Sequence, residues 1–523
     1  MGINRHFNLQ LNSSDTHTKN DVIQFFRDHH ILLIIIFAIL IRLPLVVIPE
    51  YYGFQGSGWR QTDTASIAHN FVDSNFDLFN PQIHWGGNGP GYVETEFQLY
   101  PFIVSLFYAV FGEYIAIGLA VSLLFSLGTM LSLYALARRL FSEKAATLAL
   151  IFFVISPLFI RYSVAFMPEP AVMFFYMTGL YLFVRWLDTP KLSWLLLAGA
   201  STALAILVKP TSIHLGFVIL ALVMEKYGWR FIRNPHLWLF ALISLLPGVL
   251  WYLHARNLYL TYGNTFGIIS GGDSKFDNLT YWTSPGFYFS ILETDFANVV
   301  AVGGVIPFLI GLWMGLRNRR YRLIVYGVVA VGIYYMLIPR YTSFADYYHI
   351  FMVPFAALAV GLGFEWMIGN VNLTTRLWSY RSLATVAIVL SILVVSFRDY
   401  FIDVIPEEGY LMECGYRVAQ VVPEDSLIIV STLSASEYDG VANNYQEPNV
   451  FFYSHRYGWS LPADRHTPEH LATYREEGGQ YFVIYDQELY NANPSLVSYL
   501  DQNAEQVGPG VADGCGIYRL NSN

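Results

Sequence analysis

The sequence is poor in charged residues. Of its 523 residues only 13% are charged, while 54% are hydrophobic and 17% are aromatic; an ordinary soluble domain has about 25% charged residues. A soluble chain of this length needs more polar side chains to cover its surface, so the composition argues against a cytosolic enzyme. The net charge of −9 disfavours nucleic acid as a partner, because phosphate binding requires a basic face.

Cysteine is also scarce. The two cysteines, Cys414 and Cys515, both lie near the C-terminus, and no CxxC or Cys/His spacing indicates zinc. Two interpretations stay open: two free thiols, or one disulfide, which requires an oxidising compartment. The histidines His69, His84 and His254 lack the spacing of metal ligands as well. Sequence spacing therefore gives no support for a zinc site.

Long apolar runs recur over residues 30–397. They have the length of about 17–25 residues that a helix needs to cross a bilayer. The polar N-terminus lacks an n-region with a cleavage site, so the first run predicts a retained membrane helix and not a signal peptide. We expect about eleven spans, near residues 30–48, 114–137, 145–163, 170–186, 192–208, 211–225, 236–254, 297–316, 323–338, 348–368 and 382–397.

The charge is divided unevenly along the chain. Residues 1–397 carry +4 and residues 398–523 carry −13, which predicts a boundary near residue 398. With the N-terminus inside, fourteen Lys and Arg fall on inner loops and six on the outer segments before residue 398, as the positive-inside rule expects. An odd number of spans then places the acidic C-terminal part outside, in a periplasm or its equivalent, where a Cys414–Cys515 disulfide can form.

The expected organisation is a polytopic α-helical membrane protein with an α/β domain outside the membrane. Residues 1–28 form a cytoplasmic tail, 29–397 the membrane module, and 398–523 the outer domain. Two long outer loops cover residues 49–113 and 255–296, and an aromatic run at 99–111 predicts a helix in the membrane interface. In the outer domain, the patterns predict strands at 426–431 and 481–485 and a helix at 468–477.

Asp63 is the first candidate catalytic residue. It precedes apolar positions with near-helical spacing between Ala65 and Phe71, which predicts an Asp in the first turn of a helix. Such an Asp can simply favour the helix dipole. Alternatively it is a carboxylate held at the bilayer surface as a general base, kept ionised by the nearby Arg60.

Several further charges fall at the outer ends of predicted spans, where each is a functional hypothesis. Glu169 lies between two prolines and is either a helix-start Glu or a functional acid. Lys209 ends the fifth span and either snorkels or binds an anionic headgroup. Arg340, Tyr347, Tyr348 and His349 cluster at the outer start of the tenth span. With Lys209 they form either a cationic pocket for a lipid phosphate or an aromatic belt with an anchoring Arg.

The glycine run at residues 86–91 is not a P-loop, because no Gly-Lys-Ser/Thr follows it. It predicts a flexible loop. Glu94 and Glu96 come next, and they either bind substrate or a cation together with Asp63 or hold the loop in place. Of these interpretations, a solvated loop is the one we favour from sequence.

The chain resembles the GT-C membrane glycosyltransferases, in particular the protein mannosyltransferase family (glycosyltransferase family 39) and relatives that transfer aminoarabinose to lipid A. The resemblance spans most of residues 30–400 and rests on the order and topological placement of short motifs. These are Asp63 to Phe71, Tyr92 to Pro101, Arg138-Arg139-Leu140-Phe141, Met167-Pro168-Glu169-Pro170, Leu207-Val208-Lys209-Pro210, and Tyr348-His349 before Val353-Pro354.

The resemblance implies an inverting transfer of a sugar from a polyprenyl-phosphate donor on the outer face of a bacterial inner membrane. It makes Asp63 the base and Glu169 the second acid, which positions the acceptor or a divalent cation. Family members often carry an Asp-Glu pair one helical turn earlier, where this chain has Arg60-Gln61. The residues predicted to bind the donor phosphate are Arg60, Lys209, Arg340, Tyr348 and His349.

Sequence leaves the sugar open, and the acceptor is a lipid, a glycan or a protein. Two other classes of function compete. A transporter or lipid-linked-sugar flippase is disfavoured because no paired repeat is visible and the polar clusters gather on one face. A membrane scaffold whose outer domain binds a partner would make the acids of the first outer loop dispensable.

Overall fold

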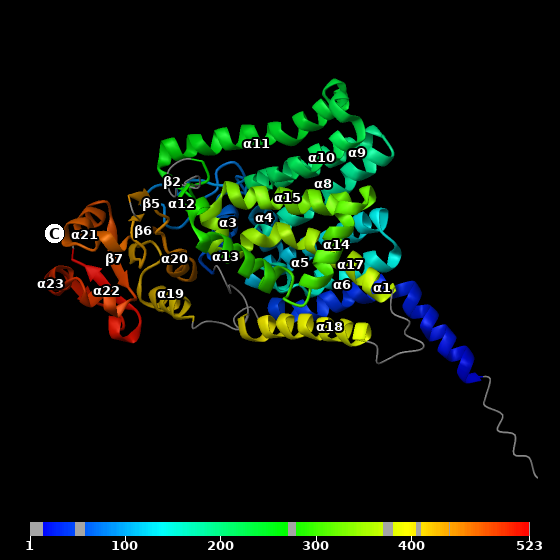
Figure 1. Ribbon diagram of the computed structural model, residues 1–523. Helices are drawn as coiled ribbons and strands as arrows, with labels where there is room; N and C mark the ends of the chain where they lie inside the picture. The colour runs from blue at the N-terminus through cyan, green and yellow to red at the C-terminus, as the bar shows by residue number, and fades with distance from the viewer. Residues whose placement is uncertain are drawn as a thin grey trace, which may run out of the picture.

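The computed structural model describes residues 14–47, 58–269, 279–369, 380–403, 409–438 and 440–521. A bundle of helices occupies most of the molecule, and a smaller α/β domain formed by the C-terminal residues lies at one end of it (Figure 1). The first half of α1 (Ser14–Val47) projects from the opposite end of the bundle.

The bundle is that of a multi-pass membrane protein, as predicted. Within the described ranges, seven helical stretches are long and apolar enough to span a membrane. They are His29–Val47 of α1, α5 (Ile115–Leu140), α8 (Glu169–Asp188), α11 (Pro235–Tyr262), Arg319–Leu337 with α15 (Arg322–Leu337), Asp346–Gly369 with α17 (Met352–Gly369), and Leu383–Phe401 with most of α18 (Tyr380–Arg398).

The other four predicted spans correspond to shorter helices. The run at 145–163 is divided into α6 (Glu143–Ile155) and α7 (Pro157–Tyr162), because Pro157 cannot donate the backbone hydrogen bond that would continue α6. The remaining three are α9 (Leu192–Val208), α10 (Leu215–Tyr227) and α14 (Val305–Arg317).

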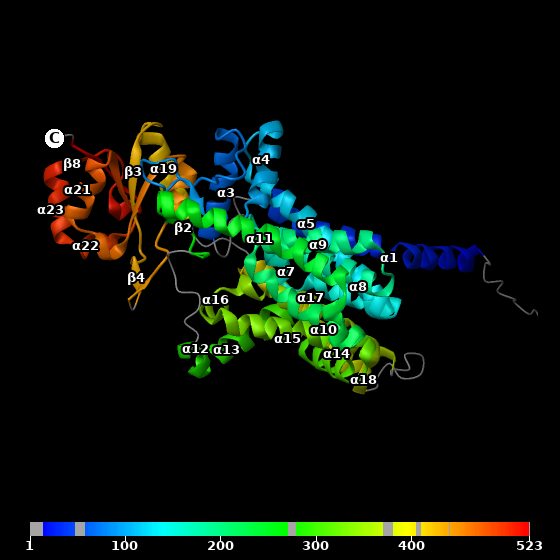
Figure 2. The same cartoon turned by 90° about the horizontal axis from the view of Figure 1, so that it is seen from above.

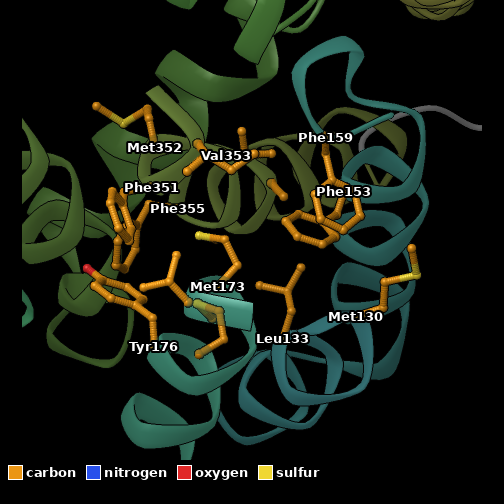
Figure 3. Close-up of a cluster of buried hydrophobic side chains, with 14 of the residues drawn as sticks. Met130, Leu133, Phe153, Phe159, Met173, Tyr176, Phe351, Met352, Val353 and Phe355 are labelled. Carbon is orange, nitrogen blue, oxygen red and sulfur yellow. The ribbon is translucent and has the colours of Figure 1, made fainter. Parts of the chain in front are cut away.

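The core of the bundle is formed by side chains from α5 to α8 and from the start of α17 (Figure 3). Phe153 of α6 and Phe159 of α7 pack with ring centres 4.0 Å apart across the break between the two helices. Met173 and Tyr176 of α8 face Phe355 of α17 in the same cluster. This packing fixes α7 and the start of α8, which carry residues of the site described below.

Small residues allow α14 and α17 to approach closely. A Cβ added to Gly311 would collide with the carbonyl oxygen of Ala359, and one added to Gly363 would collide with that of Pro307. Such contacts are typical of membrane helices, where van der Waals packing and not burial from water drives association.

The two long outer loops contact each other. The first contains α3 (Gly58–Asp73), β1 (Val93–Glu94) and α4 (Leu99–Phe111), and the second contains β2 (Asn264–Thr265), α12 (Leu279–Thr283) and α13 (Pro285–Thr294). Strands β1 and β2 pair in parallel. Because α3 begins at Gly58, Asp63 lies in its second turn and not in the first turn as predicted.

The C-terminal domain contains a five-stranded sheet in the order β6-β3-β7-β9-β8. Strand β3 pairs in parallel with β6 and β7, whereas β9 pairs antiparallel with β7 and β8. The strands are β3 (Leu427–Ser431), β6 (Gly458–Leu461), β7 (Gly479–Ile484), β8 (Ala504–Gln506) and β9 (Gly516–Leu520). The helices are α19 (Tyr410–Val421), α20 (Pro448–Ser454), α21 (Pro468–Glu476), α22 (Gln487–Asn491) and α23 (Pro494–Asn503).

The two predicted strands and the predicted helix of this domain are present as β3, β7 and α21. A disulfide joins Cys414 of α19 to Cys515, the residue before β9. It ties the first helix of the domain to its last strand.

The C-terminal domain packs on the first outer loop. Ile67 and Phe71 of α3 share a buried cluster with Val450 and Phe451 of α20. The backbone N–H of Gly458 donates to the carbonyl of His84 at 3.0 Å. Figures 1 and 2 both place α3 between the domain and the helix bundle. The domain is therefore held against the end of the bundle where the candidate site lies.

Candidate active site

A polar cavity of about 630 Å³ lies where the bundle meets the C-terminal domain. Its walls come from segments far apart in the sequence, including α3, the turn before α4, α7, the end of α9 and the C-terminal domain. The lining residues are Gly58, Trp59, Arg60, Glu96, Arg161, Tyr162, Lys209, Phe266, Ile268, Tyr341, Phe344, Ala345, Asp346, Tyr347, Tyr348, Ser434, Asn443 and Asn444.

An apolar cavity of about 690 Å³ adjoins the polar one. Its walls include Ile213, Phe217 and Leu220, together with the end of α15. The two cavities share five lining residues, namely Glu96, Lys209, Ile268, Tyr341 and Tyr348. The combined space is polar and charged at one end and apolar at the other.

Lys209 stands at the junction of the two cavities. It caps the C-terminus of α9, which ends there because Pro210 follows. Its Nζ lies 2.5 Å from Oε1 of Glu169, the first residue of α8, and over the rings of Tyr347 and Tyr348 at 4.9 and 4.5 Å. Lys209 is 4% exposed and Glu169 1% exposed, so this is a buried ion pair with one face toward the cavities.

Arg60 and Glu96 form a second ion pair in the cavity wall. One Arg60 nitrogen, Nη2, donates to both carboxylate oxygens of Glu96, at 2.9 and 3.1 Å. The guanidinium also lies over the ring of Phe266 at 5.3 Å. Since Glu96 borders both cavities, this pair stands near the same junction as Lys209.

A third ion pair was missed by the sequence reasoning. Arg161 of α7 contacts Asp346 at 2.5 Å and also pairs with Asp399, and the hydroxyl of Tyr162 donates to Asp346. The signal was present, because Arg161 is a charge inside an apolar run, and such charges mark functional sites. Asp346 gives no comparable signal until the fold places it beside Arg161.

Asp63, the predicted base, is not among the residues that line the cavity. It is 2% exposed, and its Oδ1 accepts a hydrogen bond from Trp85 Nε1 at 2.9 Å. Burial raises the pKa of Asp63 to about 7, opposed by the Trp85 hydrogen bond and the charge of Arg60. The charge of Arg60 favours the ionised form of Asp63 as expected, but burial outweighs it. Asp63 lies one helical turn from the cavity-lining Arg60.

The acids after the glycine run are buried, so the favoured interpretation of a solvated loop is wrong. Glu94 is 0% exposed and Glu96 6% exposed. Glu94 accepts hydrogen bonds from the Thr265 hydroxyl and from the backbone N–H of Ile269, the latter at 3.1 Å. Glu94 thereby joins the first outer loop to the second, a contact that the sequence does not predict.

The predicted cluster around the tenth span is only partly brought together. Tyr348 lines both cavities, whereas Arg340 and His349 are not among the lining residues of either. His349 is buried, with Nδ1 at 2.8 Å from Asp295 Oδ1 and Nε2 at 2.8 Å from the carbonyl of Thr342. The cavity instead brings together the cations Lys209, Arg60 and Arg161.

This architecture is the fold of the GT-C membrane glycosyltransferases. The structure of ArnT from Cupriavidus metallidurans bound to undecaprenyl phosphate superposes with a TM-score of 0.64 at 14% identity, covering 93% of this chain and 97% of that one. The apo oligosaccharyltransferase of Archaeoglobus fulgidus gives 0.57 at 14%, covering 92% and 73%. The arabinofuranosyltransferase AftD from Mycobacteria gives 0.56 at 13%, covering 94% and 40%.

The sequence match is more specific but shorter. Residues 98–252 match the family model described as dolichyl-phosphate-mannose-protein mannosyltransferase. This stretch runs from the turn before α4 through most of α11 and contains Arg161, Glu169 and Lys209. No curated protein matches the chain. The resemblance predicted from sequence is thus confirmed by the fold and by the family model.

Proposed function

We propose that this protein is an integral membrane glycosyltransferase that moves a sugar from a polyprenyl-phosphate donor to an acceptor hydroxyl, with inversion. The observation that carries the proposal is the pair of adjoining cavities with Lys209 at their junction. A polyprenyl-phosphate sugar has an apolar chain, an anionic phosphate and a polar sugar in that order. The apolar cavity, Lys209 and the polar cavity offer matching surroundings in the same order.

Two of the solved structures support the choice of donor. The ArnT structure contains undecaprenyl phosphate, and an Archaeoglobus fulgidus oligosaccharyltransferase structure contains a dolichol-phosphate and an inhibitory peptide. Those ligands belong to those proteins, and they show that the fold accommodates a long lipid phosphate.

In the proposed reaction the bond between the sugar and the phosphate oxygen breaks, and the lipid phosphate leaves with its negative charge. Lys209, held in place by Glu169, stabilises that charge, with Tyr348 beside it. Electrostatic stabilisation of this kind is usually the largest single catalytic contribution. Arg340 and His349 stay predicted phosphate-binding residues, and their places outside the cavity walls argue for a supporting role.

The acceptor hydroxyl needs a carboxylate to take its proton, and a base acts only within hydrogen-bond reach. Resemblance assigns this role to Asp63, whereas Glu96 and Asp346 are the acids that line the cavity. Asp63→Asn, Glu96→Gln and Asp346→Asn therefore form one comparative panel. The variant that lacks the general base should lose sugar transfer by about 10²–10⁴-fold. Near-normal transfer in Asp63→Asn would assign the general base to another acid of the panel.

The competing function is transport or flipping of a lipid-linked sugar. The test incubates the purified protein with polyprenyl-phosphate sugars and a membrane extract as the acceptor source, and measures free polyprenyl phosphate by mass spectrometry. A glycosyltransferase liberates the lipid phosphate together with a glycosylated acceptor. A flippase leaves the donor intact, and that result would overturn the proposal.

The setting of this reaction is also proposed. The charge pattern supports a bacterial inner membrane with the N-terminus in the cytoplasm and the C-terminal domain in the periplasm. The acceptor is a lipid, a glycan or a protein. A divalent cation at the cavity stays a prediction. Chelation followed by readdition of Mg²⁺ or Mn²⁺ tests it.

A further inference from the structure

Three potential metal ligands meet away from the polar cavity. His69 lies on α3, Glu113 lies between α4 and α5, and His455 follows α20. One ligand atom from each lies within 4.8 Å of the other two, and none of the three residues lines the polar cavity. Two histidines and one glutamate are the protein ligands of a well-known class of zinc sites.

A third histidine, His84, lies next to this cluster. His84 is 1% exposed, and neither of its ring nitrogens has a hydrogen-bond partner among the described residues. A buried polar group without a partner is unusual in native structures and indicates a missing ligand, water or ion. The ring centre of His84 lies 5.5 Å from that of His69, and the ring centre of His69 lies 4.9 Å from that of His455. Imidazoles that bind one tetrahedral zinc place their ring centres about 5 Å apart.

The surroundings of His69 also suit a metal ligand. Its Nδ1 lies 2.7 Å from Glu113 Oε2, and its Nε2 faces Asp73 Oδ2 at 3.4 Å. A ligating histidine almost always donates its other N–H to a carboxylate or carbonyl, which fixes the ring and its tautomer. Glu113 and His455 border a separate cavity of about 240 Å³, which gives a metal ion a path to the cluster.

We propose that His69, Glu113 and His455 bind a zinc ion, with His84 as the fourth ligand. The ion joins α3 and the loop before α5 to the C-terminal domain. The same domain contributes Ser434, Asn443 and Asn444 to the polar cavity, and α3 contributes Arg60. Zinc therefore fixes the domain over that cavity. The proposal does not depend on which reaction the cavity performs.

The test uses the full-length protein in detergent, stripped with a chelator, dialysed and titrated with Zn²⁺ alone. Wild type should bind about one zinc per chain. His455→Asn should weaken the affinity at least tenfold, since it removes a ligand. His455 adopts the left-handed conformation with φ 51°, which Asn tolerates, so the backbone is preserved.

His470→Asn is the matched control, because His470 is an exposed histidine of the same domain outside the cluster. It should bind zinc as wild type does. X-ray absorption of the zinc-loaded protein should show several imidazole ligands in wild type and fewer in His455→Asn. The proposal is overturned if wild type binds no stoichiometric zinc, or if His455→Asn binds it as tightly as His470→Asn.

Discussion

Replacing Lys209 by Met separates the catalytic role of this residue from its structural role. Lys209 and Glu169 are a buried pair, 4% and 1% exposed, joined at 2.5 Å. Removing one partner of a buried ion pair leaves an uncompensated charge and costs about 3–5 kcal/mol of stability. Lys209→Met should therefore lower the thermal unfolding temperature measured in detergent.

The double variant Lys209→Met with Glu169→Met replaces both charges by apolar side chains of similar volume. A buried pair replaced on both sides is often neutral or stabilising, so most of the lost stability should return. Transfer should not return, because the leaving phosphate still lacks its cation. By analogy with the removal of one stabilising donor, the rate of polyprenyl phosphate release should stay about 10²–10³-fold below wild type.

The assay measures release of polyprenyl phosphate per folded molecule, beside a thermal unfolding curve for each variant. Lys191→Met is the control, since Lys191 is an exposed lysine that caps the other end of α9, and it should change neither quantity. If the stable double variant transfers sugar within about threefold of wild type, a loss of under about 1 kcal/mol, then Lys209 only holds Glu169 and the reasoning is refuted.

Three further predictions concern the lipid cavity, the pH response and the disulfide. Gly216→Phe places a ring in open space beside the apolar cavity and should raise the KM for the donor about tenfold, roughly 1.4 kcal/mol. Gly332→Phe is the control, because Gly332 also faces open space but does not line the cavity, and it should leave the KM unchanged. Equal KM values in the two variants would contradict the lipid assignment. Because burial raises the pKa of Asp63 to about 7, the folded state holds a proton that the unfolded state has lost above pH 4. The free energy of unfolding should then fall as pH rises from about 4 to 7, by up to about 1.4 kcal/mol per pH unit. Asp63→Asn should lack this pH dependence. Thermal unfolding of both proteins at each pH measures the difference. Reduction should shift the masses of the peptides with Cys414 and Cys515, and Cys515→Ser should cost about 2–5 kcal/mol in denaturant unfolding of the C-terminal domain; unchanged peptide masses would contradict the disulfide.

The membrane module and the outer domain could be predicted because their patterns are local. Long apolar runs and charge placement indicate spans and orientation, and the short apolar runs at 426–431 and 481–485 indicate buried strands. No local pattern in the sequence indicates which helix ends lie next to each other in the fold. The break at Ser156-Pro157 lies inside an apolar run that has the length of a single span, so the run at 145–163 is predicted as one helix.

The candidate site was predicted only in part, for a related reason. Lys209 and Glu169 stand out as single charges in apolar surroundings, and the structure pairs them. Asp346 contacts Arg161 only through tertiary packing across 185 residues, which no local pattern encodes. The cluster of His69, Glu113 and His455 is hidden in the same way, because its residues come from separate elements and show no regular spacing.

In the proposed function, a polyprenyl-phosphate lipid occupies the two adjoining cavities with its phosphate at Lys209. The most direct measurement is mass spectrometry of the lipids that co-purify with the protein from its native membrane. Wild type should carry polyprenyl phosphate or its sugar conjugate, and the stable double variant of Lys209 and Glu169 should carry much less. Wild type free of polyprenyl lipid, or equal lipid in the double variant, would contradict the account.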